Sequence, residues 1–421
     1  MTAEEVIKAI GEDDKLEAIQ PFWEEAMAVM PEGLLPFLEP TAVIENRQWS
    51  GLEGSLDTSL LTVAAQISAD RALCCLAWYC YWRIFETGNE RLKTVPALDI
   101  IPDNNRGLFY LLIGMAMVPR LREYHKVLRI PEEITRETAQ QIFCICSNYR
   151  RAHEGHSGIF INQLVWLRNY VNGNIFLRIG RLEYWLMPFH GGVTVYRHRN
   201  SGEMIALAEA GQEYNKSGYL NGDIAIPGDE PGWVSTLSSS GSEVQGYPVL
   251  PQGRGLQQEL SLPLAEWDLV LKRGDWVLDI HIPAGGGMSL EACRDSLQRA
   301  AAFFKTCFPD RLPVAFTSAS WIFNPQLEEL LPQDSNLVKL LQELYLYPIP
   351  SLNKSIWFVF LQESFDPITA PRKTSLQRVL YDYLVDNHYW RSQGMFFLLD
   401  NLSDFGHQVY RSRIPSMINP K

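Results

Sequence analysis

The sequence predicts an α+β protein in which an all-helical N-terminal domain, residues 1–172, precedes a mixed α/β sheet domain, residues 173–421. Three observations lead to this prediction. Apolar residues recur at helical spacing almost throughout the first part. Short β-prone runs begin near Asn174. From about residue 263, strands alternate with helices, an order typical of a sheet that contains a parallel pair of strands.

The composition is that of an ordinary globular protein, and the length predicts more than one domain. Of the 421 residues, 46% are hydrophobic and 20% are charged, and one core rarely supports so long a chain. The net charge of −12 argues against nucleic acid and anionic membranes as partners. The seven cysteines lie mostly in apolar helical runs, which indicates reduced, cytosolic usage. With an acidic start and no apolar run of membrane-spanning length, we expect a cytoplasmic protein without a membrane segment.

Helices are predicted in order along the first part. Thr2 and Glu5 form a capping box for the opening helix. Residues 60–86 form a long run with apolar residues on most of its surface, so this helix is expected at the centre of the domain. Two further helices are predicted over residues 132–149, after Pro131, and over residues 159–171.

The second part begins with four β-prone runs, at residues 174–179, 181–186, 193–199 and 203–210. Residues 228–256 are rich in Gly, Ser and Pro, so a long surface loop is expected there. The predicted elements that follow are a helix at 264–271, a strand at 276–282, a helix capped by Ser289 and running to Phe308, a strand at 314–323, a helix at 335–344, a strand at 356–362, a helix from Thr374 to about Asn387, and a strand at 395–399.

Several motifs stand in the order in which one known family has them. They are Gly180-Arg181-Leu182-Glu183-Tyr184, the run from Trp276 to Gly286, Ala292 to Leu297, Ser320-Trp321 with Asn324-Pro325-Gln326-Leu327, and Thr374 to Arg378. In these motifs the chain resembles a bacterial acyltransferase-like family with a helical N-acyltransferase N-terminal domain and a GNAT-like C-terminal domain. The resemblance implies a GNAT-like fold and acyl-CoA-dependent transfer to an amine. The chain departs from the family at Ser318-Ala319-Ser320-Trp321, where we expect Cys-His-Ser-Trp.

The three glycines after the strand at 276–282 are the predicted cofactor-binding turn. A glycine turn before a helix N-terminus presents backbone N–H groups where the helix dipole is positive, which suits a diphosphate. The predicted ligand is acetyl-CoA or another acyl-CoA. Two features oppose this prediction, because Ile282 replaces the Gln or Arg of GNAT enzymes and Glu291 would repel a phosphate. The alternative is a turn required only by backbone geometry. The predicted binding residues are Ile282, Gly285, Gly286, Gly287 and Ser289.

The predicted catalytic residues are His281, Glu183 and Tyr345. A histidine titrates near neutral pH, so His281 is suited to remove the proton of the attacking amine. Glu183 is the alternative base. The resemblance implies that a tyrosine near the end of the helix at 335–344 protonates the leaving thiolate, and Tyr345 is chosen for that role. The competing interpretations are a core histidine, a surface pair of Glu183 with Arg181, and a packing tyrosine.

Two functions follow. The first is an acyl-CoA-dependent N-acyltransferase acting on a small-molecule amine. The alternative is a catalytically inactive GNAT-like protein that binds a small molecule or a protein partner, and Ile282 and Ala319 favour it. A hydrolase has no Gly-x-Ser-x-Gly motif to support it. His153 and His156, with Cys144 and Cys146 upstream, match no standard zinc spacing, so no metal site is predicted.

Overall fold

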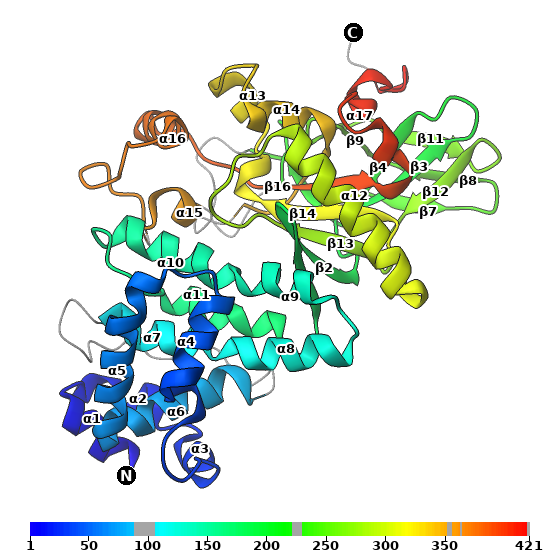
Figure 1. Cartoon of the computed structure of the whole chain (residues 1–421). Helices are drawn as coiled ribbons and strands as arrows, with labels where there is room; N and C mark the ends of the chain where they lie inside the picture. The colour runs from blue at the N-terminus through cyan, green and yellow to red at the C-terminus, as the bar shows by residue number, and fades with distance from the viewer. Residues whose placement is uncertain (88–105, 221–229, 352–355, 363, 419–421) are drawn as a thin grey trace. The chain divides into compact units, whose positions relative to one another are not determined.

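The computed structural model describes residues 1–87, 106–220, 230–351, 356–362 and 364–418. The chain divides into two compact units (Figure 1). The first contains Met1–Ile179 and Ile282–Gly285, and the second contains Gly180–His281 and Gly286–Lys421. The predicted α+β class, with helices first and a mixed sheet second, is confirmed.

The first unit is built from helices (blue to cyan in Figure 1). The capping box of Thr2 and Glu5 is present at α1. The helix predicted over residues 60–86 is two helices, because Asp70 adopts an extended conformation and its carboxylate accepts hydrogen bonds from the N–H groups of Ala72 and Leu73. The bounds are α1 Ala3–Ile10, α2 Leu16–Ile19, α3 Trp23–Ala28, α4 Pro40–Trp49, α5 Asp57–Ala69, α6 Arg71–Phe85, α7 Arg106–Met115, α8 Met117–Val127, α9 Glu132–Ala139, α10 Gln141–Ala152 and α11 Ile161–Trp166.

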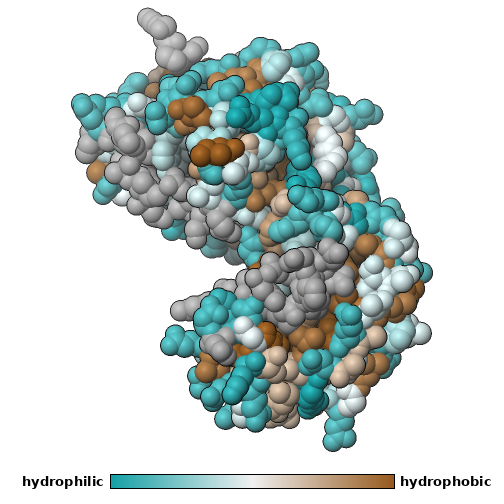
Figure 2. All heavy atoms as spheres, turned by 90° about the vertical axis from the view of Figure 1, so that its left-hand side faces the viewer, coloured by the Kyte–Doolittle hydropathy of each residue, from teal (hydrophilic) through white to brown (hydrophobic). Residues whose placement is uncertain are grey.

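Helix α6 lies at the centre of the first unit, as predicted. Most of its side chains are buried, and it contacts α1, α3, α5 and α7. Among the described residues, no single helix is both long and apolar enough to cross a bilayer. The pair 54–69 and 71–85, bent by 108°, passes that test by length and composition only, as buried core helices also do. On the face shown in Figure 2, hydrophilic residues are interspersed with small apolar areas, which is ordinary for a globular surface.

In the second unit, the strands of the largest sheet follow in the order β2-β13-β14-β16-β15, and β1 belongs to the first unit. β13 and β14 are parallel, whereas β2–β13, β14–β16 and β15–β16 are antiparallel. Helix α12, Leu290–Cys307, connects the parallel pair and packs on the sheet, where Ser296 Oγ lies 2.8 Å from the hydroxyl of Tyr184. The bounds are β1 Ile175–Ile179, β2 Leu182–Pro188, β13 Trp276–His281, β14 Ala315–Ser320, β15 Tyr345–Pro348 and β16 Gln393–Leu398.

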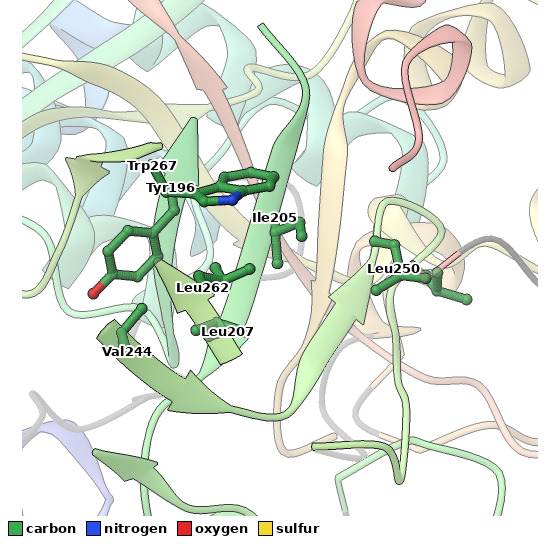
Figure 3. Close-up of a cluster of buried hydrophobic side chains, with 8 residues drawn as sticks. Tyr196, Ile205, Leu207, Val244, Leu250, Leu262 and Trp267 are labelled. Atoms are coloured by element: carbon green, nitrogen blue, oxygen red, sulfur yellow. The ribbon is translucent and has the colours of Figure 1, made fainter. Parts of the chain in front are cut away.

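Further strands occupy the region predicted as a surface loop and a short helix, so both of those predictions are wrong. Together with strands outside that region, including those predicted at residues 193–199 and 203–210, they form a five-stranded sheet, β10-β9-β4-β3-β12, and two smaller sheets, β11-β8-β7 and β5-β6. Side chains from several of these strands make one buried cluster, including Tyr196, Val244, Leu262 and Trp267 (Figure 3). The bounds are β3 Val193–His198, β4 Met204–Ala208, β5 Glu213–Asn215, β6 Pro231–Val234, β7 Leu237–Ser239, β8 Glu243–Gly246, β9 Pro248–Leu250, β10 Arg254–Gly255, β11 Leu260–Pro263 and β12 Trp267–Leu271.

The end of the chain differs from prediction at one strand. Helix α14, Asn336–Glu343, is confirmed, but β15 begins at Tyr345, directly after it. The strand predicted at residues 356–362 is wrong, because α15, Trp357–Phe360, is helical. Helix α16, Ser375–Val385, begins after Thr374 as predicted, and Thr374 forms a capping box with Gln377. The remaining helices are α13 Leu327–Leu330 and α17 Val409–Ser412.

Candidate functional site

The parallel ladder between β13 and β14 is short. It ends at the pair Asp279–Thr317. Beyond that pair, β13 stays paired with β2 as far as His281, and β14 stays paired with β16 as far as Ser320. The two parallel strands therefore stop pairing with each other while each keeps its antiparallel neighbour. The hydroxyl of Ser318 donates a hydrogen bond to the Ile280 carbonyl oxygen at 2.7 Å, just past this point.

The predicted glycine turn follows β13. Gly285 and Gly286 have φ of +82° and +58°, a conformation that L side chains rarely adopt. A Cβ on Gly285 or Gly287 would meet nothing within 4 Å, so backbone conformation, not lack of space, requires glycine at 285. Ser289 is the N-cap of α12, and its hydroxyl accepts a hydrogen bond from the Ala292 N–H. The strand-turn-helix order predicted from the sequence is thus present.

Arg181, in the turn before β2, holds the glycine turn from one side. Its Nε donates to the Gly287 carbonyl oxygen at 2.9 Å, and its Nη2 donates to the Gly286 carbonyl oxygen at 3.2 Å. In a trans peptide the C=O and N–H groups point in opposite directions. The N–H groups of Gly287 and Met288 therefore point away from the guanidinium. Sequence reasoning missed this role, because it depends on contacts between segments far apart in the chain.

Strand alternation brings several polar side chains to one face of the sheet, opposite the face that packs against α12. His281 lies across from Glu183 on β2, so two predicted bases are neighbours. The Nε2 of His281 is 3.3 Å from Asp279 Oδ2, and Thr317 Oγ1 donates to Asp279 Oδ1 at 3.1 Å. The ring of Trp185 is 6.2 Å from that of His281. Glu183 is 1% exposed, so its alternative as a surface pair is wrong.

Asp279 and Thr317 were not among the predicted site residues. The signal for Asp279 was available in the sequence, because it lies two residues before His281 and so shares its strand face. The signal for Thr317 was not available, since its partner on β13 depends on the register of a parallel pair separated by α12.

Tyr345 shares this face, but its hydroxyl is occupied. It accepts a hydrogen bond from the Ala206 N–H at 3.2 Å and donates one to the Val249 carbonyl oxygen at 2.5 Å. Both partners belong to the five-stranded sheet. Burial raises the pKa of Tyr345 far above its ordinary value. Tyr345 therefore connects two sheets, and its hydroxyl proton is already donated to the Val249 carbonyl oxygen.

Tyr347 lies two residues further along β15 and on the same face. Within the part of the chain that the structure describes, no hydrogen bond to its hydroxyl is found. A Cβ on Gly394 would lie 2.3 Å from the tyrosine ring, and one on Gly191 would lie 2.6 Å from the hydroxyl oxygen, so both glycines make room for this side chain. Burial, and then the charge of Asp279, raise the pKa of Tyr347.

The histidine and cysteine residues near 150 do not form a metal site in the described residues. No group of three or more His, Cys, Asp or Glu side chains there is close enough to hold an ion. His153 stacks on Tyr149 at 3.9 Å between ring centroids, and Cys144 and Cys146 are buried thiols.

In the comparison with known proteins, two family models match this chain, one after the other. The model of the N-acyltransferase N-terminal domain matches residues 53–173, and the model of the GNAT-like C-terminal domain matches residues 176–397. No curated protein sequence matches the chain. A solved structure of an acyltransferase mutant in complex with octanoyl-CoA is 19% identical, with a TM-score of 0.62 over 95% of this chain and 100% of that one.

Two further structures are similar. One, an acyltransferase "in complex with decanoyl-CoA and teicoplanin", is 20% identical, with a TM-score of 0.62 over 95% of this chain and 100% of that one. Another, "in complex with decanoyl-CoA", is 21% identical, with a TM-score of 0.55 over 94% and 99%. At such identities the likeness shows the fold. Since the GNAT-like model alone matches residues 176–397, more than half of the chain, this protein belongs to the family with an N-acyltransferase N-terminal domain and a GNAT-like C-terminal domain.

Proposed function

We propose that this protein is an acyl-CoA-dependent N-acyltransferase that acylates the amine of a small-molecule acceptor. One observation carries the proposal: the parallel ladder of β13 and β14 ends at Asp279–Thr317, just before a glycine turn and an 18-residue helix. A thioester beside the end of β13 would meet a polar sheet face, and its diphosphate would reach the turn. The similar solved structures are named as acyltransferases with octanoyl-CoA or decanoyl-CoA, which supports the predicted co-substrate.

The glycine turn is the proposed diphosphate site. The N–H groups of Gly287 and Met288 would donate to phosphate oxygens, and the dipole of α12 would add positive potential. Arg181 fixes the peptide orientation by binding the Gly286 and Gly287 carbonyls. Ser289 contributes as the N-cap, since its hydroxyl is used by the Ala292 N–H. Glu291 opposes binding from the first helical turn, at a solvent-exposed position where its charge is screened.

The proposed chemistry uses the face that holds His281. The acceptor amine attacks the thioester carbonyl, a C–N bond forms, and the C–S bond breaks. A backbone N–H of β13 polarises the carbonyl. His281 takes the amine proton, and Glu183 is its buried neighbour on β2. Tyr347 replaces Tyr345 in the proposal as the donor of a proton to the CoA thiolate, because the Tyr345 hydroxyl is bound to the backbone of β4 and β9.

The acceptor is proposed as a small molecule that carries a nucleophilic amine. Support comes from a similar acyltransferase whose structure is described as a complex with decanoyl-CoA and teicoplanin. A panel of amines, assayed by release of the CoA thiol from acetyl-, octanoyl- and decanoyl-CoA, tests this part. Binding of acyl-CoA without thiol release for any amine would favour the inactive binding protein, the alternative that Ile282 and Ala319 supported.

Calorimetry on the full chain tests the co-substrate. We expect saturable binding of octanoyl-CoA, and we expect Arg181→Met to weaken it about tenfold, because the turn loses its fixed orientation. The same variant should bind octanoyl-pantetheine, which has no diphosphate, as the wild type does. Arg273→Met, a change in the turn between β12 and β13, is the matched control and should not alter either affinity. Folded wild-type protein that binds no acyl-CoA would contradict the proposal.

A further inference from the structure

Asp279 is the carboxylate at the residue pair where β13 and β14 stop pairing, and its two oxygens have different neighbours. Oδ1 accepts the hydrogen bond from Thr317 Oγ1 at 3.1 Å. Oδ2 lies 3.3 Å from Nε2 of His281. The side chains of Asp279 and His281 are 25% and 32% exposed, so solvent screens this pair less than a surface pair.

We infer that Asp279 is a positioning residue that holds His281 with its proton on Nε2 and leaves Nδ1 as the unprotonated nitrogen. The inference rests on the proposed function, in which His281 takes a proton. A carboxylate oxygen accepts hydrogen bonds, so Asp279 favours the tautomer in which the nearby Nε2, 3.3 Å from Oδ2, carries the hydrogen. A neutral imidazole has one N–H, and the other nitrogen is then the base. Thr317 fixes the rotation of the carboxylate, because its hydroxyl holds Oδ1.

The surroundings of His281 give this arrangement a chemical role. Asp279 faces it from β13, Glu183 and Trp185 face it from β2, and Thr317 and Tyr347 lie on the same sheet face from β14 and β15. When the amine proton moves to Nδ1, the imidazolium that forms lies beside the Asp279 charge, which stabilises it. The thiolate takes the Tyr347 proton, and the imidazolium returns its proton to the tyrosine through solvent.

The substitution Asp279→Asn makes a sharp prediction. The Thr317 hydroxyl would still donate to the amide oxygen, so the amide NH₂ would take the place of Oδ2 and face Nε2. An NH₂ group only donates, so Nε2 would have to accept and the ring proton would move to Nδ1. The variant would keep its volume and its link to Thr317 but present the wrong nitrogen to the amine.

Nitrogen-15 NMR on the full chain, with labelled histidine, reads the tautomer directly and needs no substrate. The His281 signal is assigned by its loss in His281→Asn. We expect the Nε2–H tautomer in the wild type and the Nδ1–H tautomer in Asp279→Asn. The matched control is Asp275→Asn, just before the other end of β13, where the Asp275 carboxylate accepts the Lys272 N–H; it should leave the His281 tautomer unchanged. A wild-type Nδ1–H tautomer, or no change in Asp279→Asn, overturns the inference.

Kinetics supply the second measurement. With any amine that the wild type acylates, Asp279→Asn should lower kcat by about 10²–10⁴-fold. The KM for acyl-CoA should change less than about twofold, because the turn that binds CoA is intact. An equal loss with Asp275→Asn would show a general structural effect and overturn the assignment. If the wild type acylates nothing but shows the expected tautomers, the proposed function fails and the Asp279–His281 arrangement stands.

Discussion

At the scale of single residues, β15 shows how neighbours of one chemical type can have different roles. Tyr345 and Tyr347 are two positions apart, are both buried and point to the same sheet face. Tyr345 reaches the backbone of the second sheet, where its hydroxyl has a donor and an acceptor. Tyr347 occupies space that a side chain at Gly191 or Gly394 would fill, and among the described residues its hydroxyl has no hydrogen bond of the kind that Tyr345 makes. Hydrogen bonding, not residue type or burial, is the difference on which the proposed roles of the two tyrosines rest.

Replacing each tyrosine by phenylalanine separates these roles. Tyr345→Phe leaves the Ala206 N–H and the Val249 carbonyl without their partner, so the free energy of unfolding should fall by about 1–3 kcal/mol, with kcat nearly unchanged. Tyr347→Phe should leave stability unaltered and lower kcat on the order of 10²-fold. Denaturant unfolding and steady-state kinetics measure the two effects. The opposite assignment, with activity lost in Tyr345→Phe alone, would restore Tyr345 as the acid.

The sequence could predict some of these residues and not others. His281 and the glycine turn follow from a strand, a turn and a helix that are adjacent in the chain, so local pattern suffices. Asp279 lies on the same strand as His281, and strand alternation alone predicts that the two side chains share one face. Thr317 and Tyr347 meet that face only through the pairing of β13 with β14 and of β16 with β15. Choosing Tyr347 over Tyr345 requires knowledge of the contacts that Tyr345 makes with β4 and β9, which no local signal gives.

At the scale of elements, local sequence pattern gave a wrong prediction at β12, a strand whose buried residues have helical spacing. In β12, Trp267 and Leu271 are buried and the residues between them are less so. A buried pair at i and i+4 is the helical pattern. Here a register shift between Leu269 and Leu271 produces it in a strand paired with β3. Caps were more reliable, because a cap needs only its own few residues: Thr2, Ser289 and Thr374 all begin helices as predicted.

The capping box of α16 gives an element-scale prediction. The Thr374 hydroxyl accepts from the Gln377 N–H, and the Gln377 side chain accepts from the Thr374 N–H. Thr374→Ala removes the hydrogen bond from the Gln377 N–H to the Thr374 hydroxyl. This should lower the free energy of unfolding by about 1 kcal/mol. Thr374→Ser keeps the hydroxyl and should cost much less. Chemical denaturation of the two variants compares them. Equal stability would mean that packing alone begins the helix.

At the scale of the whole molecule, the order of helices and then a mixed sheet was predictable, because hydrophobic period and alternation of elements decide it. Of the second sheet, β3 and β4 were predicted as β-prone runs, but β9, β10 and β12 were not, since they are short and are held by pairings distant in sequence. Each of the two compact units also has polar groups that are wholly or partly buried. The second unit has a half-buried ion pair, in which Arg411 binds Glu328 through two hydrogen bonds at 2.6 and 2.7 Å. The first unit buries a neutral histidine.

That histidine, His125 on α8, predicts the acid sensitivity of the helical unit. It is 1% exposed, and its Nδ1 is 2.9 Å from Thr135 Oγ1. Among the described residues, its Nε2 has no hydrogen-bond partner. Burial lowers the pKa of His125 from the ordinary 6.5 to about 4. Between pH 6.5 and about 4, His125 binds a proton in the unfolded chain but stays neutral in the folded one. The contribution of His125 to the free energy of unfolding is therefore fully present above pH 6.5 and is lost as pH falls toward 4.

The loss should approach about 3 kcal/mol, from a pKa difference of roughly 2.5. Urea unfolding of the wild type, followed by the far-UV helical signal at several pH values between neutral and acidic, measures it. His125→Asn retains a short amide beside Thr135 but does not titrate, so its stability should be lower at neutral pH and should fall less steeply on acidification. His156→Asn, at an exposed position of the same unit, should keep the wild-type slope. If His125→Asn keeps that slope as well, carboxylates and not the buried imidazole set the acid response.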